Sequence, residues 1–167
     1  MLSICYNAFA QNNNMQPELT AEEIFEMNKN SVVSIWYVST ANNNFYTSKE
    51  DTVILSGSGF ILTQGGIVGT NNHVIKNYDS LLIKTYDGSM HNAEVIATFV
   101  DNDVALLKIK DSVETVYPFV TIGNVDSIKA GQPIYAIGSP MGFEFSISSG
   151  IIAAIRQNEK VNFLDYE

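Results

Sequence analysis

Residues 93–109 read Ala93-Glu-Val-Ile-Ala-Thr-Phe-Val-Asp-Asn-Asp-Val-Ala-Leu-Leu-Lys-Ile109. In the first half, every second residue is alanine, valine or phenylalanine, which is the two-residue period of a β-strand. These residues are Ala93, Val95, Ala97 and Phe99, and they alternate with Glu94, Ile96, Thr98 and Val100. Asp101-Asn-Asp103 interrupts this pattern with polar residues that favour a turn. Val104–Ile109 then returns to apolar and β-branched residues. The stretch therefore predicts two strands with a tight turn between them.

Similar short runs recur on both sides of this stretch. Turn signals such as Gly65-Gly66 and Asp87-Gly88 separate them at intervals of roughly ten residues. Thr20 followed by Glu23 has the form of a capping box and predicts one short helix over residues 20–29. No regular alternation of strands and helices follows, so we expect an all-β chain, built as an antiparallel barrel or sandwich. The other predicted strands are Val32–Val38, Ile54–Leu55, Phe60–Leu62, Ile67–Thr70, Leu81–Tyr86, Val116–Ile122, Ile134–Ile137 and Phe145–Ile155.

The composition excludes several classes of protein. Of the 167 residues, 46% are hydrophobic and 16% are charged, which is typical of a folded chain and not of a disordered one. The formal charge is −9 and Arg156 is the one arginine, so we expect no nucleic-acid partner, because such partners need clustered basic residues. No apolar run reaches the ~20 residues of a membrane-spanning helix. With one cysteine and two histidines, we expect no internal disulfide, no metal and no cofactor.

Residues 1–16 stand apart from the rest of the sequence. Leu2–Ala10 is mostly apolar and ends in Ala8-Phe9-Ala10, which has the small-x-small pattern of a signal-peptide cleavage site. The basic residues that usually open such a leader are missing, and the apolar run is short. Two interpretations stay open, a clipped export signal and a disordered tail. Loss of a leader would also remove Cys5, which favours the prediction that the protein is exported to the periplasm or beyond the cell.

The two histidines are the first candidates for chemistry. His91 follows the Asp87-Gly88 turn among polar neighbours, and we expect it to be exposed at the start of a strand. His73 lies in Gly69-Thr-Asn-Asn-His-Val-Ile75, directly after a predicted strand. On chemistry alone, a hydrogen-bonded histidine in a capped turn would explain this segment as well as a functional one.

Asp103 gives His73 a suitable partner. It abuts an apolar strand, where an ionised carboxylate is costly unless another group satisfies it. A histidine can do so, because the carboxylate fixes the imidazole tautomer and stabilises the imidazolium. Asp103 follows His73 by 30 residues. Of the three common orders of serine hydrolases, only His–Asp–Ser fits this pair in an all-β chain.

Five stretches of the sequence resemble a known family. In their order and spacing, from about Ser31 to Ile155, they are similar to the trypsin-like serine proteases, and among these to the bacterial HtrA-type branch. The stretches are Ser56-Gly-Ser-Gly-Phe60, Gly69-Thr-Asn-Asn-His-Val74, Asp103-Val-Ala-Leu-Leu107, Gly131-Gln-Pro-Ile-Tyr-Ala-Ile-Gly-Ser-Pro140 and Ser148-Ser-Gly-Ile-Ile152.

The resemblance implies both a fold and an activity. The fold would be a trypsin-like double β-barrel, with a complete first barrel over residues 17–122 and an incomplete second barrel over residues 123–167. The full-length protein would be a serine endopeptidase acting on polypeptides. His73 would serve as the general base and Asp103 would orient it. The resemblance implies no cofactor or metal and leaves the oligomeric state open.

One part of the family pattern is missing. The Gly-Asn-Ser-Gly-Gly segment that carries the nucleophile in this family does not occur in the sequence, and Ser58, Ser139 and Ser149 match other segments. We therefore expect these 167 residues to supply the base and the orienting acid, and to be inactive alone. Two alternatives remain open. One is a non-catalytic, protease-like domain that binds extended peptides at a sheet edge. The other is a structural domain in which His73 and Asp103 never meet.

Overall fold

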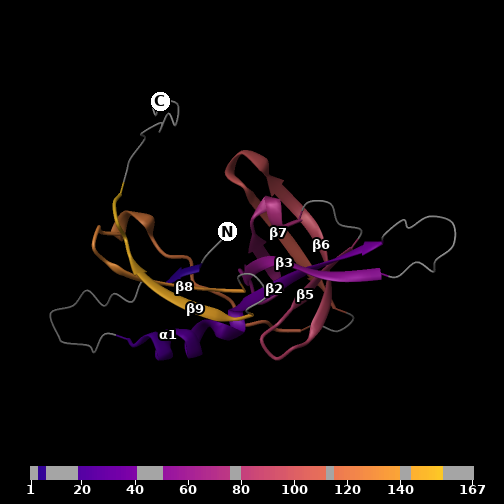
Figure 1. The fold of residues 1–167 in the computed structure, drawn as a ribbon, viewed down its shortest axis with the longest axis horizontal. Coiled ribbons are helices and arrows are strands. Elements are labelled where there is room, and N and C mark those ends of the chain that lie inside the picture. The colour runs from indigo at the N-terminus through magenta and orange to yellow at the C-terminus, as the bar shows by residue number, and fades with distance from the viewer. Residues whose placement is uncertain are drawn as a thin grey trace.

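The computed structural model describes residues 4–6, 19–40, 51–75, 80–111, 115–139 and 144–155. Two β-sheets and one short α-helix make up most of these residues (Figure 1). The elements in chain order are β1 (Ile4–Tyr6), α1 (Ala21–Asn28), β2 (Val32–Thr40), β3 (Asp51–Ile61), β4 (Ile67–Thr70), β5 (Ser80–Lys84), β6 (Met90–Phe99), β7 (Val104–Lys110), β8 (Pro133–Gly138) and β9 (Ser146–Ile151). Short 3₁₀ turns lie at Lys29–Ser31, Asn72–Ile75, Val100–Asn102 and Val125–Ser127.

Six strands close into an antiparallel barrel in the order β2-β3-β4-β7-β6-β5. The barrel closes because β2 pairs with β3 along one edge and with β5 along the other. Inward-facing side chains alternate with outward-facing ones, most clearly in β7, as the sequence pattern predicts. The fully buried core includes Val33, Ile35, Ile61, Val68, Leu81, Ile83, Ala105 and Leu107. The predicted first barrel of an all-β fold is thus confirmed.

Strand β3 continues through Ser56-Gly-Ser-Gly59, with a bulge at Ser56 in its ladder with β2, whereas the sequence pattern predicts two separate strands on either side of this segment. Gly59 has a packing reason to be glycine, because a Cβ there would lie 2.9 Å from the Gly69 carbonyl oxygen. The close approach of β3 to β4 therefore explains a residue that reads as a strand breaker in the sequence.

The predicted strand Val116–Ile122 is wrong. Residues 115–124 have no regular structure and run along the barrel, tied to it by hydrogen bonds from the Tyr117 N–H to the Gln64 carbonyl (3.0 Å) and from the Val120 N–H to the Ile61 carbonyl (2.9 Å). Tyr117 and Val120 are buried, while Val116, Phe119 and Ile122 are exposed. Burial at every third residue does not match the two-residue period of a strand, and Pro118 has no N–H to donate to a sheet.

The second sheet has three strands in the order β1-β8-β9. Both predicted strands of this region are present and pair antiparallel as β8 and β9, but β9 ends at Ile151 and not at Ile155. Ile4–Tyr6 pairs with Tyr135–Ile137 of β8, a pairing that the sequence analysis does not predict. The assignment of residues 1–16 to a leader or tail and the two domain boundaries stay predictions.

Helix α1 lies against the second sheet and contacts β8 and β9 (Figure 1). Its N-terminus has the predicted capping box, in which the Thr20 hydroxyl accepts from the Glu23 N–H and the Glu23 carboxylate accepts from the Thr20 N–H. Ile24 is fully buried. The helix therefore packs against the second sheet, with Ile24 as its buried apolar side chain.

A line of serine hydroxyls joins the barrel to the second sheet. The Ser34 and Ser139 hydroxyls are 2.7 Å apart, and the Ser139 N–H donates to the Ser58 hydroxyl at 2.6 Å. Ser34 and Ser139 are almost completely buried. We call Ser34, Ser58 and Ser139 the serine seam.

In the described part of the chain, no helix is long and apolar enough to cross a membrane.

Candidate active site

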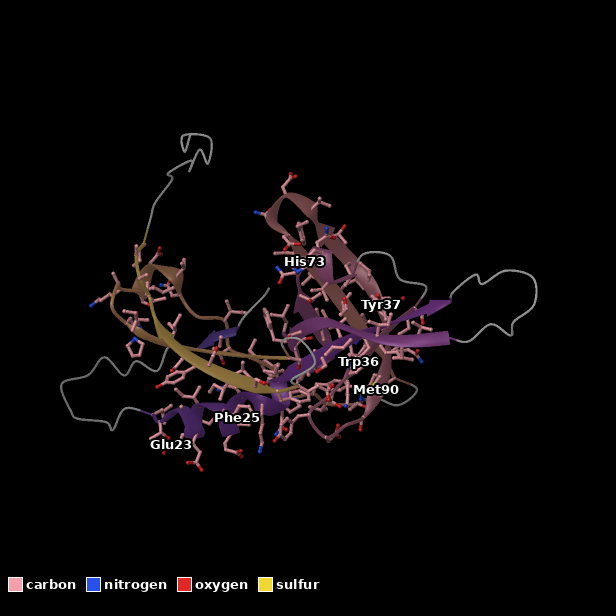
Figure 2. The ribbon with its side chains drawn as sticks, viewed as in Figure 1. Glu23, Phe25, Trp36, Tyr37, His73 and Met90 are labelled. Atoms are coloured by element: carbon pink, nitrogen blue, oxygen red, sulfur yellow. The ribbon has the colours of Figure 1, made fainter. Side chains whose placement is uncertain are left out.

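The barrel topology brings His73 and Asp103 to the same end of two paired strands. Strand β4 ends at Thr70 and β7 begins at Val104, and Thr70 lies opposite Ala105 in the ladder. His73 follows β4 in a 3₁₀ turn, and Asp103 comes directly before β7. Two residues that lie 30 positions apart in the sequence therefore meet at one rim of the barrel. In Figure 2, His73 lies at the opposite end of the barrel from Met90, where β6 begins.

Asp103 is held by hydrogen bonds to both of its carboxylate oxygens. The His73 N–H donates to Oδ1 at 2.8 Å, and His73 Nδ1 lies 2.6 Å from Oδ2. The predicted hydrogen bond between the two side chains is present, which contradicts the alternative in which they never meet. Asp103 itself has left-handed backbone angles, φ 52° and ψ 43°, which are uncommon for residues other than glycine.

The electrostatics of the pair fix the direction of this bond. The hydrogen bond from the His73 backbone N–H, followed by the one from its imidazole, holds the pKa of Asp103 below its ordinary value. Asp103 is therefore ionised at neutral pH and can only accept, so Nδ1 of His73 carries the proton. No described residue hydrogen-bonds to Nε2 of His73. Its lone pair is available to accept a proton, and the side chain is 49% exposed.

Asn71 also binds Asp103, a contact that the sequence pattern does not predict. Its side-chain NH₂ donates to the Asp103 carbonyl oxygen at 2.9 Å and to Oδ2 at 3.1 Å. The Asn72 N–H donates to the same carbonyl at 3.1 Å. The only signal in the sequence is the pair of amides directly before His73, which reads equally well as a loop.

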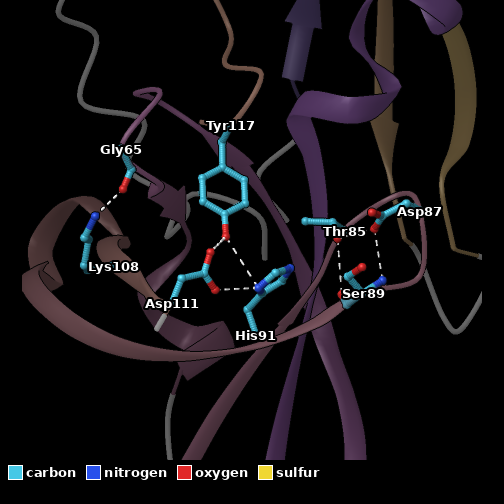
Figure 3. A network of polar contacts seen from close by, with 8 residues as sticks. All are labelled: Gly65, Thr85, Asp87, Ser89, His91, Lys108, Asp111 and Tyr117. Atoms are coloured by element: carbon cyan, nitrogen blue, oxygen red, sulfur yellow. Dashed lines mark hydrogen bonds and ion pairs between the residues drawn. The ribbon is translucent and has the colours of Figure 1, made fainter. Parts of the chain in front are cut away.

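His91 does not lie as predicted. Its side chain is 18% exposed, and Nδ1 lies 2.8 Å from Oδ1 of Asp111. The Tyr117 hydroxyl donates to the other carboxylate oxygen of Asp111. Figure 3 shows the side chains of His91, Asp111 and Tyr117 pointing toward one another. The prediction of an exposed histidine is wrong because the Tyr117 ring packs edge-on against the His91 ring, with 5.8 Å between the ring centroids, and Asp111 hydrogen-bonds to it.

The cluster of His91, Asp111 and Tyr117 lies at the other end of the β6–β7 pair from His73. Burial alone would raise the pKa of Asp111, but the hydrogen bonds from Tyr117 and His91 outweigh it and lower that pKa. Burial, together with donation to Asp111, raises the pKa of Tyr117 far above its ordinary value. Both groups thus keep their neutral-pH forms, and the cluster anchors residues 115–118 to the barrel. A cavity of about 350 Å³ lies beside it, bounded by the turn at Thr85–Ser89.

The serines with glycine neighbours are placed elsewhere. Ser58 and Ser139 belong to the serine seam, and Ser149 lies on the exposed part of β9. Among the described residues, no group of three or more His, Cys, Asp or Glu side chains could hold a metal ion.

Comparison with known proteins identifies the family. A family model described as a trypsin-like peptidase domain matches residues 57–167. The chain belongs to this family. It is homologous to the HtrA/DegP-like serine endoproteases, and the trypsin-like double-barrel fold expected from the sequence is confirmed, with the second sheet forming part of the second barrel.

Individual relatives give the extent of the match. The chain is 42% identical over 98 residues to a probable periplasmic serine endoprotease, DegP-like, of Pseudomonas fulva, covering 59% of this chain and 20% of that protein. The corresponding protein of Pseudomonas fluorescens is 45% identical over 101 residues, again covering 59% and 20%. The chain thus spans about a fifth of the length of these curated relatives. A solved structure of the HtrA-type protease AlgW with a decapeptide superimposes with a TM-score of 0.74 at 22% identity, over 89% of this chain and 50% of that one.

Proposed function

We propose that the full-length protein is a serine endopeptidase, in which His73 is the general base and Asp103 the residue that orients it. The observation that carries the proposal is the 2.6 Å contact between His73 Nδ1 and Asp103 Oδ2, on a histidine side chain that is 49% exposed. In an imidazole held in this way, Nδ1 donates its proton to the carboxylate, and Nε2 can accept a proton from another group. This is the arrangement that proton transfer from a serine hydroxyl requires.

The reaction would proceed by acyl transfer. His73 Nε2 removes the proton from a serine hydroxyl as the serine oxygen bonds to the carbonyl carbon of the peptide. The imidazolium that forms is stabilised by the ionised Asp103. It then returns the proton to the leaving amine as the C–N bond breaks, leaving an acyl-enzyme. Water attacks the ester in the same way and releases the acid.

The nucleophilic serine and the oxyanion-binding amides would come from a segment outside these 167 residues. The sequence has no Gly-Asn-Ser-Gly-Gly segment, and the curated relatives are about five times as long as the matched stretch. The substrates would be unfolded or extended polypeptides. The periplasm would be the site of action, as the names of the relatives suggest for those proteins.

Substitution of the pair in the full-length protein tests the proposal. His73→Ala and Asp103→Asn should each reduce kcat for cleavage of an unfolded protein by roughly 10⁴-fold or more, because proton transfer and the correct tautomer are lost. A matched control is His91→Asn at the other end of the barrel, which should keep kcat within a few-fold.

The same series separates the alternative function. The non-catalytic binding domain predicts a different set of results. The full-length protein would bind extended peptides, but it would not cleave them and would not be labelled by a fluorophosphonate probe. Labelling of the 167-residue chain alone, at Ser58, Ser139 or Ser149, would contradict the assignment of the nucleophile to another segment.

A further inference from the structure

Asn71 holds both the backbone and the side chain of Asp103 with a single amide group. One hydrogen of its NH₂ group points to the Asp103 carbonyl oxygen (2.9 Å) and the other to Oδ2 (3.1 Å). The side chain belongs to a buried residue with 7% exposure, so water does not readily replace either bond. Oδ2 is also the oxygen that contacts His73 Nδ1. The amide therefore acts on the same atom as the imidazole.

The backbone contact matters because Asp103 is in the left-handed region, with φ 52° and ψ 43°. Aspartate adopts these angles more readily than most residues with a side chain, but still at a cost in free energy, so hydrogen bonds to its backbone help to hold it there. Here the Asp103 carbonyl is fixed by two donors, the Asn71 side chain and the Asn72 N–H. Loss of the Asn71 donor would let the carbonyl rotate toward ordinary extended angles. That rotation would swing the carboxylate away from His73.

The orientation of the amide is unambiguous. A rotation by 180° about its last bond would place its oxygen against the Asp103 carbonyl and carboxylate oxygens, all of which are acceptors. In the orientation observed, Oδ1 of Asn71 is buried without a hydrogen-bond partner among the described residues. A buried acceptor without a partner is costly, so two good bonds at the other end of the amide are needed to hold it there.

We propose that Asn71 is a positioning residue for the His73–Asp103 pair: it keeps Asp103 in its left-handed conformation and directs Oδ2 at the imidazole. The inference rests on the proposed function, because it assigns Asn71 a part in the same proton transfer. Asn71 does not touch the reacting atoms, and its contribution passes through Asp103.

The test uses ¹⁵N NMR of the histidine side chains in the 167-residue chain at neutral pH. In the unsubstituted chain, neutral His73 should be predominantly the Nδ1–H tautomer, because Asp103 accepts that proton. Asn71→Leu removes both donors while keeping a side chain of similar size. It should lower the ratio of Nδ1–H to Nε2–H by roughly fivefold or more, since the second nitrogen's hydrogen bond sets the tautomer.

A matched control separates positioning from a general loss of stability. The Asn28 side-chain NH₂ donates to the Ile24 carbonyl at 2.8 Å within the first helix. Asn28→Leu removes a bond of the same chemistry far from His73. It should leave the His73 tautomer unchanged even if the melting temperature falls as much as in Asn71→Leu.

Two different results would overturn two different claims. If the unsubstituted chain shows no Nδ1–H tautomer at His73, the catalytic pair itself is wrong. If that tautomer is present and persists in Asn71→Leu, the pair stands and the role of Asn71 is wrong. In the full-length enzyme, Asn71→Leu should lower kcat by roughly 10- to 100-fold with little change in KM, because misplacement of a catalytic group affects the chemical step.

Discussion

Asp111 contributes to the pH dependence of this chain's stability. Its carboxylate accepts hydrogen bonds from Tyr117 and His91, and its folded-state pKa lies below the ordinary value of 3.8. The unfolded chain therefore takes up this proton at a higher pH than the folded chain does. The stabilisation from Asp111 is fully present above about pH 4 and is lost as the pH falls through the folded-state pKa.

Removal of the Tyr117 hydroxyl tests this assignment. Tyr117→Phe should lower the free energy of unfolding at pH 7 by about 1–2 kcal/mol, because a buried hydrogen bond to a charged acceptor is lost. The same change should raise the pKa of Asp111, so the loss of stability on acidification should begin at a higher pH. Urea unfolding between pH 3 and pH 7 measures both effects.

Tyr37 supplies the control, because its hydroxyl makes no hydrogen bond to the described residues. Tyr37→Phe should leave the pH profile unchanged. An identical profile for Tyr117→Phe would mean that the hydroxyl does not stabilise the Asp111 carboxylate.

At the scale of strands and turns, close contact between backbones explains glycines that strand propensity alone would place outside a strand. The two-residue period correctly predicts β6 and β7, since each has one face on the core. It fails for residues 116–122, where apolar side chains recur without a ladder, and at Ser56-Gly-Ser-Gly59, where glycines lie inside a strand. The contact between β3 and β4 is a tertiary feature, and nothing local in the sequence encodes it.

Gly59→Ala should therefore destabilise the barrel. The new Cβ would lie 2.9 Å from both the Gly69 carbonyl oxygen and a Val68 methyl carbon, and β3 would have to move away from β4. We expect a loss of about 1–3 kcal/mol in the free energy of unfolding, the usual cost of overpacking.

Gly150→Ala in β9 is the matched control, because its Cβ would have only an ordinary contact of 4.0 Å with Ile134. It should change stability little, measured by chemical denaturation. Equal effects of the two substitutions would refute the close-contact explanation of Gly59.

The contact between His73 and Asp103 was predictable to a similar degree, because their residue types, order and spacing have a chemical meaning. The contact of Asn71 with Asp103 was not, because it depends on the left-handed angles of Asp103. The covered position of His91 depends on Pro118 and Tyr117 folding back over the barrel. Both features depend on the path of the backbone between strands, which cannot be predicted from local sequence patterns.

At the scale of the whole molecule, the two sheets differ in how well they are covered. The barrel has a closed ladder and a buried core, whereas no described strand pairs with the outer edge of β9, and Ile151 is 63% exposed. Open edges and exposed apolar side chains are typical of regions that open readily. The second sheet should therefore be the less stable half of this chain.

Hydrogen exchange of the isolated chain measures this difference. Backbone amides of residues 146–151 should exchange at least ~10-fold faster than those of residues 104–109, because opening the second sheet requires less free energy than unfolding the barrel. Equal and strong protection of both segments in a monomer would show that the second sheet is stable as it stands.

The serine seam has a consequence for how the chain is made. Its two facing hydroxyls, on Ser34 and Ser139, are 105 residues apart. A ribosome that adds roughly 5–20 residues per second would need on the order of 5–20 seconds between them. All six barrel strands leave the ribosome before the partner of Ser34 does. If folding keeps pace with synthesis, the barrel can close while this side of β2 is still in contact with water, and Ser139 then meets Ser34 on a surface that already exists.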